Sequence, residues 1–161
     1  MMIFKRTHMC GELRLADAEK EVVLNGWIAK KRNLGGLIFC DLRDKKGIVQ
    51  IVFDDNISDE LREKADSLRS EYVVGVKGAV KERQSKNKDI PTGEIEVVPE
   101  KIEVLGKCIY NELPFEINRS KEADENVRLK HRYLDLRNPA VKNKIILRCQ
   151  VVSALRAAMT A

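Results

Sequence analysis

The sequence has few of the residues from which metal centres and nucleophilic active sites are built. Its two histidines, His8 and His131, are not spaced as partners, and none of its four cysteines belongs to a Cys-x-x-Cys pair. Zinc sites and catalytic thiols usually need such groupings. We therefore expect no metal site and no catalytic thiol, and we expect Cys40 and Cys149, which fall on predicted apolar faces, to behave as small hydrophobes.

Long apolar runs are also missing. No segment approaches the length of a membrane span, and the opening Met-Met-Ile-Phe-Lys-Arg becomes charged too quickly for a secretory signal. With 43% hydrophobic and 34% charged residues over 161 positions, the composition is typical of a soluble globular protein with one core of ordinary size. A cytoplasmic location is the expectation that follows.

An excess of positive charge is absent from most of the chain, although the net charge is +5. From Ser120 onward there are 9 basic and 4 acidic residues, which accounts for the whole excess. Only local clusters could therefore attract nucleic acid to the preceding residues. One cluster is Lys30, Lys31 and Arg32. A second follows later in the chain and comprises Lys77, Lys81, Arg83, Lys86 and Lys88.

What the sequence does contain is a succession of short β-type segments. Apolar alternation and glycine-containing turns predict strands at about 22–31, 37–43, 48–53, 72–83 and 94–104. Ser58 is expected to cap a helix between the third and fourth strands, with Leu61, Ala65 and Leu68 at helical spacing. This order predicts a mainly β fold, the five-stranded OB-fold barrel, which binds oligonucleotides. The intervening helix disfavours the nearest alternative, an SH3-like barrel.

Side-chain parity predicts a nucleic-acid-binding face on the second and third strands. Because successive side chains on a strand point to opposite faces, Phe39 lies opposite the apolar residues of its strand, among charged neighbours. Gln50 likewise lies opposite the apolar face of the third strand and offers both donors and an acceptor. An exposed aromatic, an amide and basic groups on adjacent strands are typical of a base-stacking and base-reading surface.

Each of these residues also has an ordinary interpretation. A phenylalanine is more often part of a core, a lone glutamine is usually a solvated strand residue, and a basic run is usually a solvated surface. The coincidence of all three on adjacent strands favours the nucleic-acid interpretation, provided that no β-bulge changes the parity.

The character of the sequence changes after Gly106. Residues 107–119 lack periodicity and are typical of a linker, and residues 121–137 are expected to be helical and charged. Asn138 and Pro139 predict the start of another helix. An apolar stripe with helical spacing continues to the end of the chain without a stop signal, so we expect a fragment of a longer polypeptide. The stripe comprises Val141, Ile145, Cys149, Val152 and Leu155.

Seven strings of the sequence match one known family: Arg6–Arg14, Gly26–Trp27, Gly35–Phe39, Asp41–Asp44, Gly47–Phe53, Thr92–Val97 and Arg128–Arg137. Together they resemble the N-terminal portion of bacterial-type aspartyl-tRNA synthetases, which are class II enzymes. The resemblance spans essentially the whole chain. Lysyl- and asparaginyl-tRNA synthetases share the barrel but resemble these strings much less.

The resemblance implies an OB-fold that binds the tRNA anticodon over residues 1–106. A linker or hinge would follow over 107–137, and the truncated start of a class II catalytic domain over 138–161. By similarity, Phe39 would stack on the middle anticodon base and Gln50 would hydrogen-bond to it. Lys30 and Arg32 would contact the backbone or bases of the anticodon loop.

Three further contacts are implied by the resemblance. Arg83 and Asn87 would touch the third anticodon base, and Glu96 would touch the first. The residues alone do not single out Glu96, because a carboxylate on a strand is most often simply solvated. A carboxylate could, however, accept hydrogen bonds from a guanine edge.

The family's three class II motifs, which carry ATP, aspartate and the dimer contact, would all follow Ala161. We therefore expect this fragment to be no enzyme and to hold no cofactor. The parent enzyme would be a homodimeric aspartate–tRNA ligase that uses ATP and Mg²⁺.

Two alternatives belong to other functional classes. The chain could be a free-standing OB module that binds single-stranded nucleic acid without sequence choice, which predicts equal affinity for unrelated oligonucleotides. It could also be an interaction domain with no nucleic-acid role, in which case Lys30, Arg32 and Gln50 could be replaced without consequence. The amphipathic tail disfavours the free-standing module, since such a module needs no helix of this kind.

Overall fold

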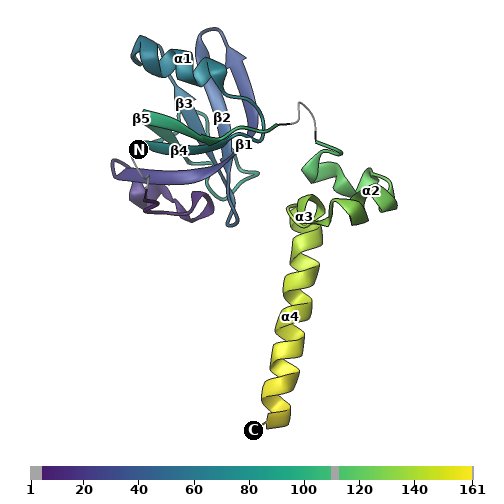
Figure 1. The fold of residues 1–161 in the computed structure, drawn as a ribbon. Helices are drawn as coiled ribbons and strands as arrows, with labels where there is room; N and C mark the ends of the chain where they lie inside the picture. The colour runs from purple at the N-terminus through teal and green to yellow at the C-terminus, as the bar shows by residue number, and fades with distance from the viewer. Residues whose placement is uncertain (1–4, 110–112, 161) are drawn as a thin grey trace. The chain divides into compact units, whose positions relative to one another are not determined.

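The computed structural model, which describes residues 5–109 and 113–160, divides into two compact units, residues 1–109 and 110–161. The first unit is mainly β and forms a five-stranded barrel (Figure 1). Two short 3₁₀ helices, η1 (Cys10–Glu12) and η2 (Leu15–Asp17), precede the first strand. The strands are β1 (Glu21–Leu34), β2 (Leu37–Arg43), β3 (Ile48–Phe53), β4 (Val73–Glu82) and β5 (Ile95–Gly106).

The strand order around the barrel is β1-β2-β3-β5-β4, and β4 returns to pair with β1. All pairs are antiparallel except β3 with β5, which meet in a short parallel pairing at Ile51 and Val97. This order, with one helix between β3 and β4, is that of an OB-fold. The fold class expected for the first unit is confirmed. The barrel is closed by the short pairing between β3 and β5.

The predicted alternation determines which side chains fill the barrel. In β2 every second residue is buried, beginning at Ile38, and in β3 the buried set includes Val49, Ile51 and Phe53. Both strands have the bounds predicted from the sequence. Cys40 is fully buried in this core, where burial raises the pKa of its thiol to about 12, so the group stays neutral and apolar.

Strand β1 extends three residues farther than predicted because its turn is shorter. Gly35 and Gly36 both have positive φ, 61° and 101°, and they alone connect β1 to β2. Two-residue hairpin turns of this kind favour glycine because other residues resist positive φ. Residues 32–34 are therefore paired with β2 instead of lying in a loop.

Helix α1 (Asp59–Ser67) connects β3 to β4 and packs into the barrel core. The Ser58 Oγ accepts a hydrogen bond from the Leu61 N–H at 3.3 Å, which confirms the predicted cap. Leu61 and Ala65 are buried, and Leu68 follows them into the core just after the helix ends.

The second unit is helical, and residues 121–137 are largely helical as expected. They form several short helices: the 3₁₀ helix η3 (Ile117–Glu122) is followed by α2 (Glu125–Lys130) and α3 (Arg132–Asp135). The break between η3 and α2 has a local cause. Ala123 is extended, and the Asp124 carboxylate caps α2 by accepting from the Asn126 N–H at 2.9 Å. Asp is a preferred cap residue, so the sequence carries a local signal for this break.

A buried carboxylate holds these short helices together. Asp135 is fully buried and accepts hydrogen bonds from Ser120 at 2.7 Å and Arg128 at 3.3 Å, and also from Arg132. Asn138 donates to the Ser120 hydroxyl at 3.1 Å. Burial acts to raise the pKa of Asp135, but the hydrogen bonds from Ser120 and Arg128 outweigh it and hold the pKa below its ordinary value.

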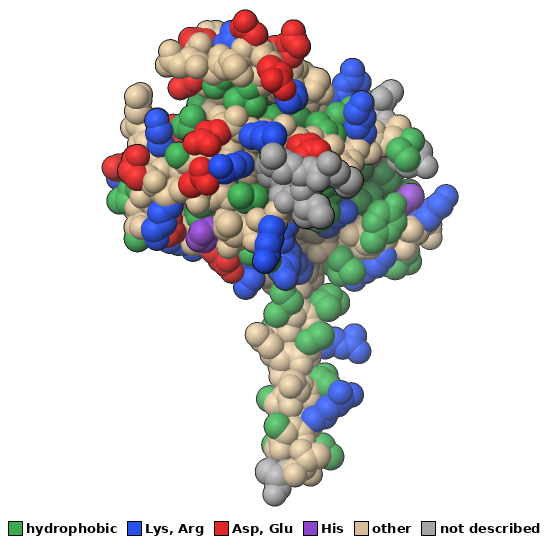
Figure 2. Space-filling view, turned by 60° about the vertical axis from the view of Figure 1, so that its left-hand side comes forward, with side chains coloured by type: hydrophobic (Ala, Val, Ile, Leu, Met, Phe, Trp, Pro, Cys, Tyr) green, Lys and Arg blue, Asp and Glu red, His purple; other side chains and the backbone are tan. Residues whose placement is uncertain are grey.

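Helix α4 (Pro139–Thr160) begins where the sequence predicts. The Asn138 Oδ1 accepts from the Ala140 N–H at 2.9 Å, which is the expected cap. Of the apolar stripe on this helix only Val141 is buried, whereas Leu155 remains 59% exposed and Cys149 is also exposed. Figure 2 shows hydrophobic side chains along the length of α4.

None of the helices in the described ranges combines the length and the apolar character needed to span a bilayer.

Candidate nucleic-acid interface

Three neighbouring strands place six side chains on the barrel surface, on the side opposite to the core residues. Two rows of directly paired residues cross β1, β2 and β3. Directly opposed residues in antiparallel strands project from the same face. We call this surface the outer face, and it comprises Lys30, Asp41 and Gln50 in one row and Arg32, Phe39 and Val52 in the other.

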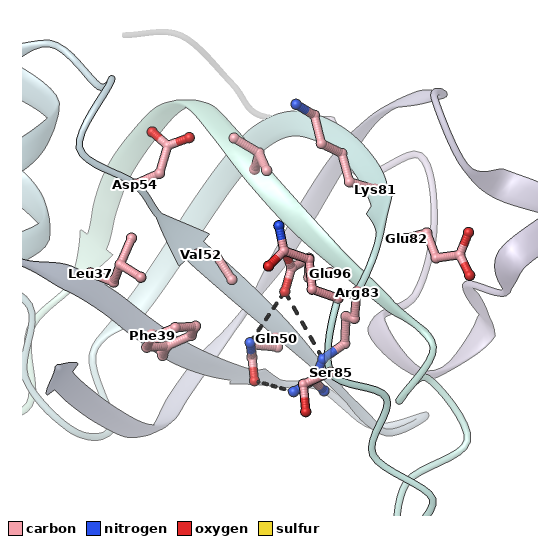
Figure 3. A pocket seen from close by; sticks show the side chains of 12 residues that line it. Leu37, Phe39, Gln50, Val52, Asp54, Lys81, Glu82, Arg83, Ser85 and Glu96 are labelled. Atoms are coloured by element: carbon pink, nitrogen blue, oxygen red, sulfur yellow. Dashed lines mark hydrogen bonds and ion pairs between the residues drawn. The ribbon is translucent and has the colours of Figure 1, made fainter.

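A hollow of about 420 Å³ adjoins the outer face (Figure 3). Its lining includes Phe39 from β2, Gln50 from β3 and Glu96 from β5, together with Arg83 just beyond the end of β4. Phe39 is partly exposed here, as predicted, and is not part of the core. The structure thus brings four of the seven proposed site residues into one hollow.

Gln50 is at the centre of a hydrogen-bond network in this hollow. Its Oε1 accepts from the Arg83 Nη2 at 2.9 Å, and its Nε2 donates to the Glu96 Oε2 at 3.4 Å. The residue is only 5% exposed. Because an amide has two N–H groups and two oxygen lone pairs, half of its hydrogen-bonding capacity remains for a ligand. The two protein partners fix which way the amide faces.

Glu96 is the third member of the network, and its surroundings change its pKa. The Arg83 Nε lies 4.0 Å from the Glu96 Oε2. Burial raises the pKa of Glu96 above its ordinary value, and the Arg83 charge and the Gln50 hydrogen bond counter part of that effect. A partly buried carboxylate of this kind is an acceptor that acidification removes more readily than an exposed one.

The basic cluster of residues 30–32 does not act as one group. Lys30 is exposed on the outer face, and Arg32 extends from the same face to Asp41, with its Nη2 2.9 Å from the Asp41 Oδ1. Lys31 instead donates its ammonium to the carbonyls of Ala65 at 2.8 Å and Asp66 at 2.7 Å, at the end of α1. Lys31 is therefore a structural residue, and the prediction of a three-residue cluster needs this correction.

The second basic cluster is largely neutralised within the protein. Lys77 pairs with Glu21 at 2.9 Å, and Lys86 pairs with Glu82 at 2.8 Å. Arg83 faces the hollow, and Lys81 is among the residues that line it.

The Asn87 side chain is bonded within its own loop. It is not among the residues that line the hollow, and its Oδ1 accepts a hydrogen bond from the Asp89 N–H at 2.8 Å within its own loop. Its backbone N–H also bonds to the Gly93 carbonyl at 2.9 Å. A short, internally bonded loop thus directs this amide toward its own backbone.

Two residues on the outer face were not selected from the sequence. Val52 is 7% exposed and lies beside Phe39 in the register, and Asp41 lies between Lys30 and Gln50. The signal for Asp41 was available, because it alternates with Phe39 along β2. A carboxylate was not an expected member of a surface for a polyanion.

The arrangement is suited to reading an unstacked base. A partly exposed ring provides a stacking surface, an oriented amide and a carboxylate provide hydrogen bonds to base edges, and Lys30 and Arg32 provide positive charge beside them. Within residues 5–109 and 113–160, no three or more His, Cys, Asp or Glu side chains gather in a way that could hold a metal ion.

Comparison with known proteins agrees with this geometry. The family described as OB-fold nucleic acid binding domain, the tRNA anticodon-binding family, matches residues 22–105, which is more than half of the chain.

Individual relatives extend the match to nearly the whole chain. The aspartate–tRNA(Asp/Asn) ligase of Caldanaerobacter subterraneus subsp. tengcongensis is 48% identical over 154 residues, covering 94% of this chain and 26% of the relative. The aspartate–tRNA ligase of Bacteroides fragilis is 44% identical over 151 residues, with the same coverage of each chain. The chain therefore spans about a quarter of the length of these curated relatives.

A solved structure shows the same fold. The asparaginyl-tRNA synthetase of Pyrococcus horikoshii superimposes with a TM-score of 0.79 at 31% identity, and the match covers 98% of this chain and 34% of that one.

Proposed function

This chain belongs to the family of tRNA anticodon-binding OB-fold domains, and we propose that it is the anticodon-binding region of an aspartate–tRNA ligase. The observation that carries the proposal is the grouping of Phe39, Gln50, Arg83 and Glu96 around one hollow beside a basic strand. A fold that binds oligonucleotides across its second and third strands has its recognition groups on that surface.

Within this proposal each residue of the hollow has a role. Phe39 stacks on the middle anticodon base, and Gln50 hydrogen-bonds to the same base through the part of its amide that Arg83 and Glu96 leave free. Glu96 accepts hydrogen bonds from the first base. Lys30 and Arg32 contact the loop backbone or its bases.

The third anticodon base is assigned to Arg83 and Asn87. Arg83 is already oriented by its contacts with Gln50 and Glu96, which supports its part in this assignment. The Asn87 Oδ1 accepts a hydrogen bond from the Asp89 N–H, which orients this side chain toward its own loop. We therefore expect Arg83 to contribute more to third-base recognition than Asn87.

The ligase chemistry is proposed for the longer protein. Its relatives by name attach aspartate to tRNA, and this chain spans about a quarter of their length. We assign ATP, Mg²⁺, aspartate and the homodimer contact to the remaining length, and residues 138–161 to the start of the catalytic domain. Residues 107–137 would be the hinge that follows an anticodon-binding domain over 1–106. A cytoplasmic location belongs to the same proposal.

The test is a binding comparison between two anticodon stem-loops that differ only in the anticodon. One carries the aspartate triplet and the other an unrelated triplet, so both present the same phosphates. We expect clearly tighter binding of the aspartate stem-loop. Equal affinity would instead favour an OB module that binds single strands without sequence choice, and no binding to either would contradict a nucleic-acid role for the isolated chain.

A further inference from the structure

A carboxylate occupies the middle of the outer face. Asp41 is paired with Lys30 on one side and with Gln50 on the other, and its side chain is 24% exposed. A negative charge at this position weakens the attraction of the face for phosphate, because binding to nucleic acid gains from each positive charge that neutralises the backbone. Asp41 therefore does not increase the general affinity of the outer face for nucleic acid.

The role of Asp41 is indicated by its ion pair with Arg32. Arg32 is paired directly with Phe39, and its guanidinium reaches diagonally to the Asp41 Oδ1 at 2.9 Å. Such diagonal contacts are within reach of long side chains on neighbouring strands. Asp41 thus restrains a flexible cation immediately beside the proposed stacking ring.

The contact leaves the guanidinium partly unsatisfied. Among the residues that the structure describes, Asp41 bonds only to Nη2 of this guanidinium, and the Arg32 side chain is 40% exposed, so donors remain for a ligand. An arginine with a restrained orientation and unused N–H donors binds well only to a ligand whose acceptors lie in the plane of its guanidinium. A lysine ammonium can rotate to suit several ligand geometries, but the planar guanidinium cannot.

We propose that Asp41 is a specificity-determining residue of this face, an inference that rests on the anticodon-binding function proposed above. It holds Arg32 in one orientation beside Phe39, and its charge repels phosphates that approach when the bases do not fit. A matching loop uses the free donors of the restrained Arg32. The phosphates of a mismatched loop are instead repelled by the Asp41 carboxylate. Selectivity gained through such repulsion comes at the expense of overall affinity.

The test compares the unchanged chain with Asp41→Asn and Asp41→Ser on the two stem-loops described above. Both variants remove the negative charge, so the test can still be made if one of them fails to fold. Because a partly exposed ion pair has a modest effect, we expect the unrelated stem-loop to bind about two- to fivefold tighter to the variants. The preference for the aspartate stem-loop should fall about fivefold.

Two controls separate this role from a general charge effect. Glu63→Gln removes one charge from an exposed position on α1, which contributes nothing to the hollow, and should leave the preference unchanged. In a chain that carries Arg32→Ala, Asp41→Asn should alter the preference by less than it does in the unchanged chain, because the restraint on Arg32 is already lost and only the charge effect remains.

An unchanged preference in both Asp41 variants would overturn this inference while leaving the proposed function in place. An equal effect of Asp41→Asn with and without Arg32 would overturn it in the same way. Equal binding of both stem-loops by the unchanged chain would overturn the proposed function, and this inference would fall with it.

Discussion

At the scale of single residues, the proposed contact with tRNA depends most on the ring of Phe39. Stacking of a base on an aromatic side chain contributes about 1–3 kcal/mol, so Phe39→Ala should weaken binding of the aspartate stem-loop about 5- to 150-fold. Phe39→Leu keeps an apolar side chain but has no π face, and we expect it to lose most of the same affinity. Fluorescence titration would measure both, and unchanged binding by Phe39→Ala would contradict the stacking role.

The carboxyl group of Glu96 leads to a prediction about pH. Because burial raises its pKa, Glu96 becomes protonated at a higher pH than an exposed glutamate does. Stem-loop affinity should therefore fall as the pH is lowered through this raised pKa, and Glu96→Gln should flatten that part of the profile. Titrations from about pH 7.5 down to about pH 4.5 would show the difference, since ordinary carboxyl groups titrate near the lower limit. A profile that the substitution does not change would rule out Glu96 as the titrating acceptor.

The same raised pKa gives folding stability the opposite pH dependence to stem-loop affinity. The folded state binds the proton of Glu96 more tightly than the unfolded state does. The contribution of this group to stability is therefore fully present at low pH and is lost as the pH rises through the folded-state value.

At the scale of secondary-structure elements, two adjacent lysines on β1 have separate roles. The Lys31 ammonium bonds to the carbonyls at the end of α1, where a cation also interacts favourably with the helix dipole. Lys31→Met should therefore lower the free energy of unfolding by about 1–2 kcal/mol in urea denaturation. Its effect on stem-loop affinity should be small.

Lys30→Met is the matched variant, with the same change one residue away. Lys30 is exposed on the outer face, so its loss should change stability by no more than about 0.5 kcal/mol. Affinity should fall, and the slope of log affinity against log salt should decrease by about 0.7 for one lost phosphate contact on a single-stranded loop. Loss of stability in Lys30→Met with full stability in Lys31→Met would refute this division.

At the scale of the whole molecule, the exposed side of α4 predicts self-association of this chain. Ile145, Val152 and Leu155 are 39%, 38% and 59% exposed along one helix, and contiguous apolar surface of this kind tends to be covered. Sedimentation velocity should show an average mass that rises with protein concentration. Leu155→Glu should reduce the association, and Gln150→Glu, at another exposed position of α4, should have less effect. A monomer at high concentration would contradict the prediction.

Much of the fold was predictable because its determinants are local. Alternation of apolar residues established the bounds of β2 and β3, and Ser58 and Asn138 indicated the helices that follow them. The partly exposed position of Phe39, outside the core, followed from the same alternation. The break before α2 is also local, but Asp124 lies in a charged stretch where it does not stand out as a cap residue.

The composition of the site was less predictable, because strand register and loop placement are not local properties. A register shift in β1 lies between Ile28 and Lys30, immediately before the basic run, so the direction of Lys31 could not be obtained by counting along the strand. Asn87 and Arg83 are close in sequence, yet only Arg83 faces the hollow.

The sequence by itself determined a five-stranded barrel with an aromatic, an amide and basic groups on one side, because period-two alternation decides which side chains leave the core. Only the tertiary structure decided how those groups meet. Gln50 and Glu96 are 46 residues apart in the chain and come into contact through the closure of the barrel between β3 and β5. The same closure partly buries Glu96 and so raises its pKa, since desolvation depends on every neighbour that folding brings close.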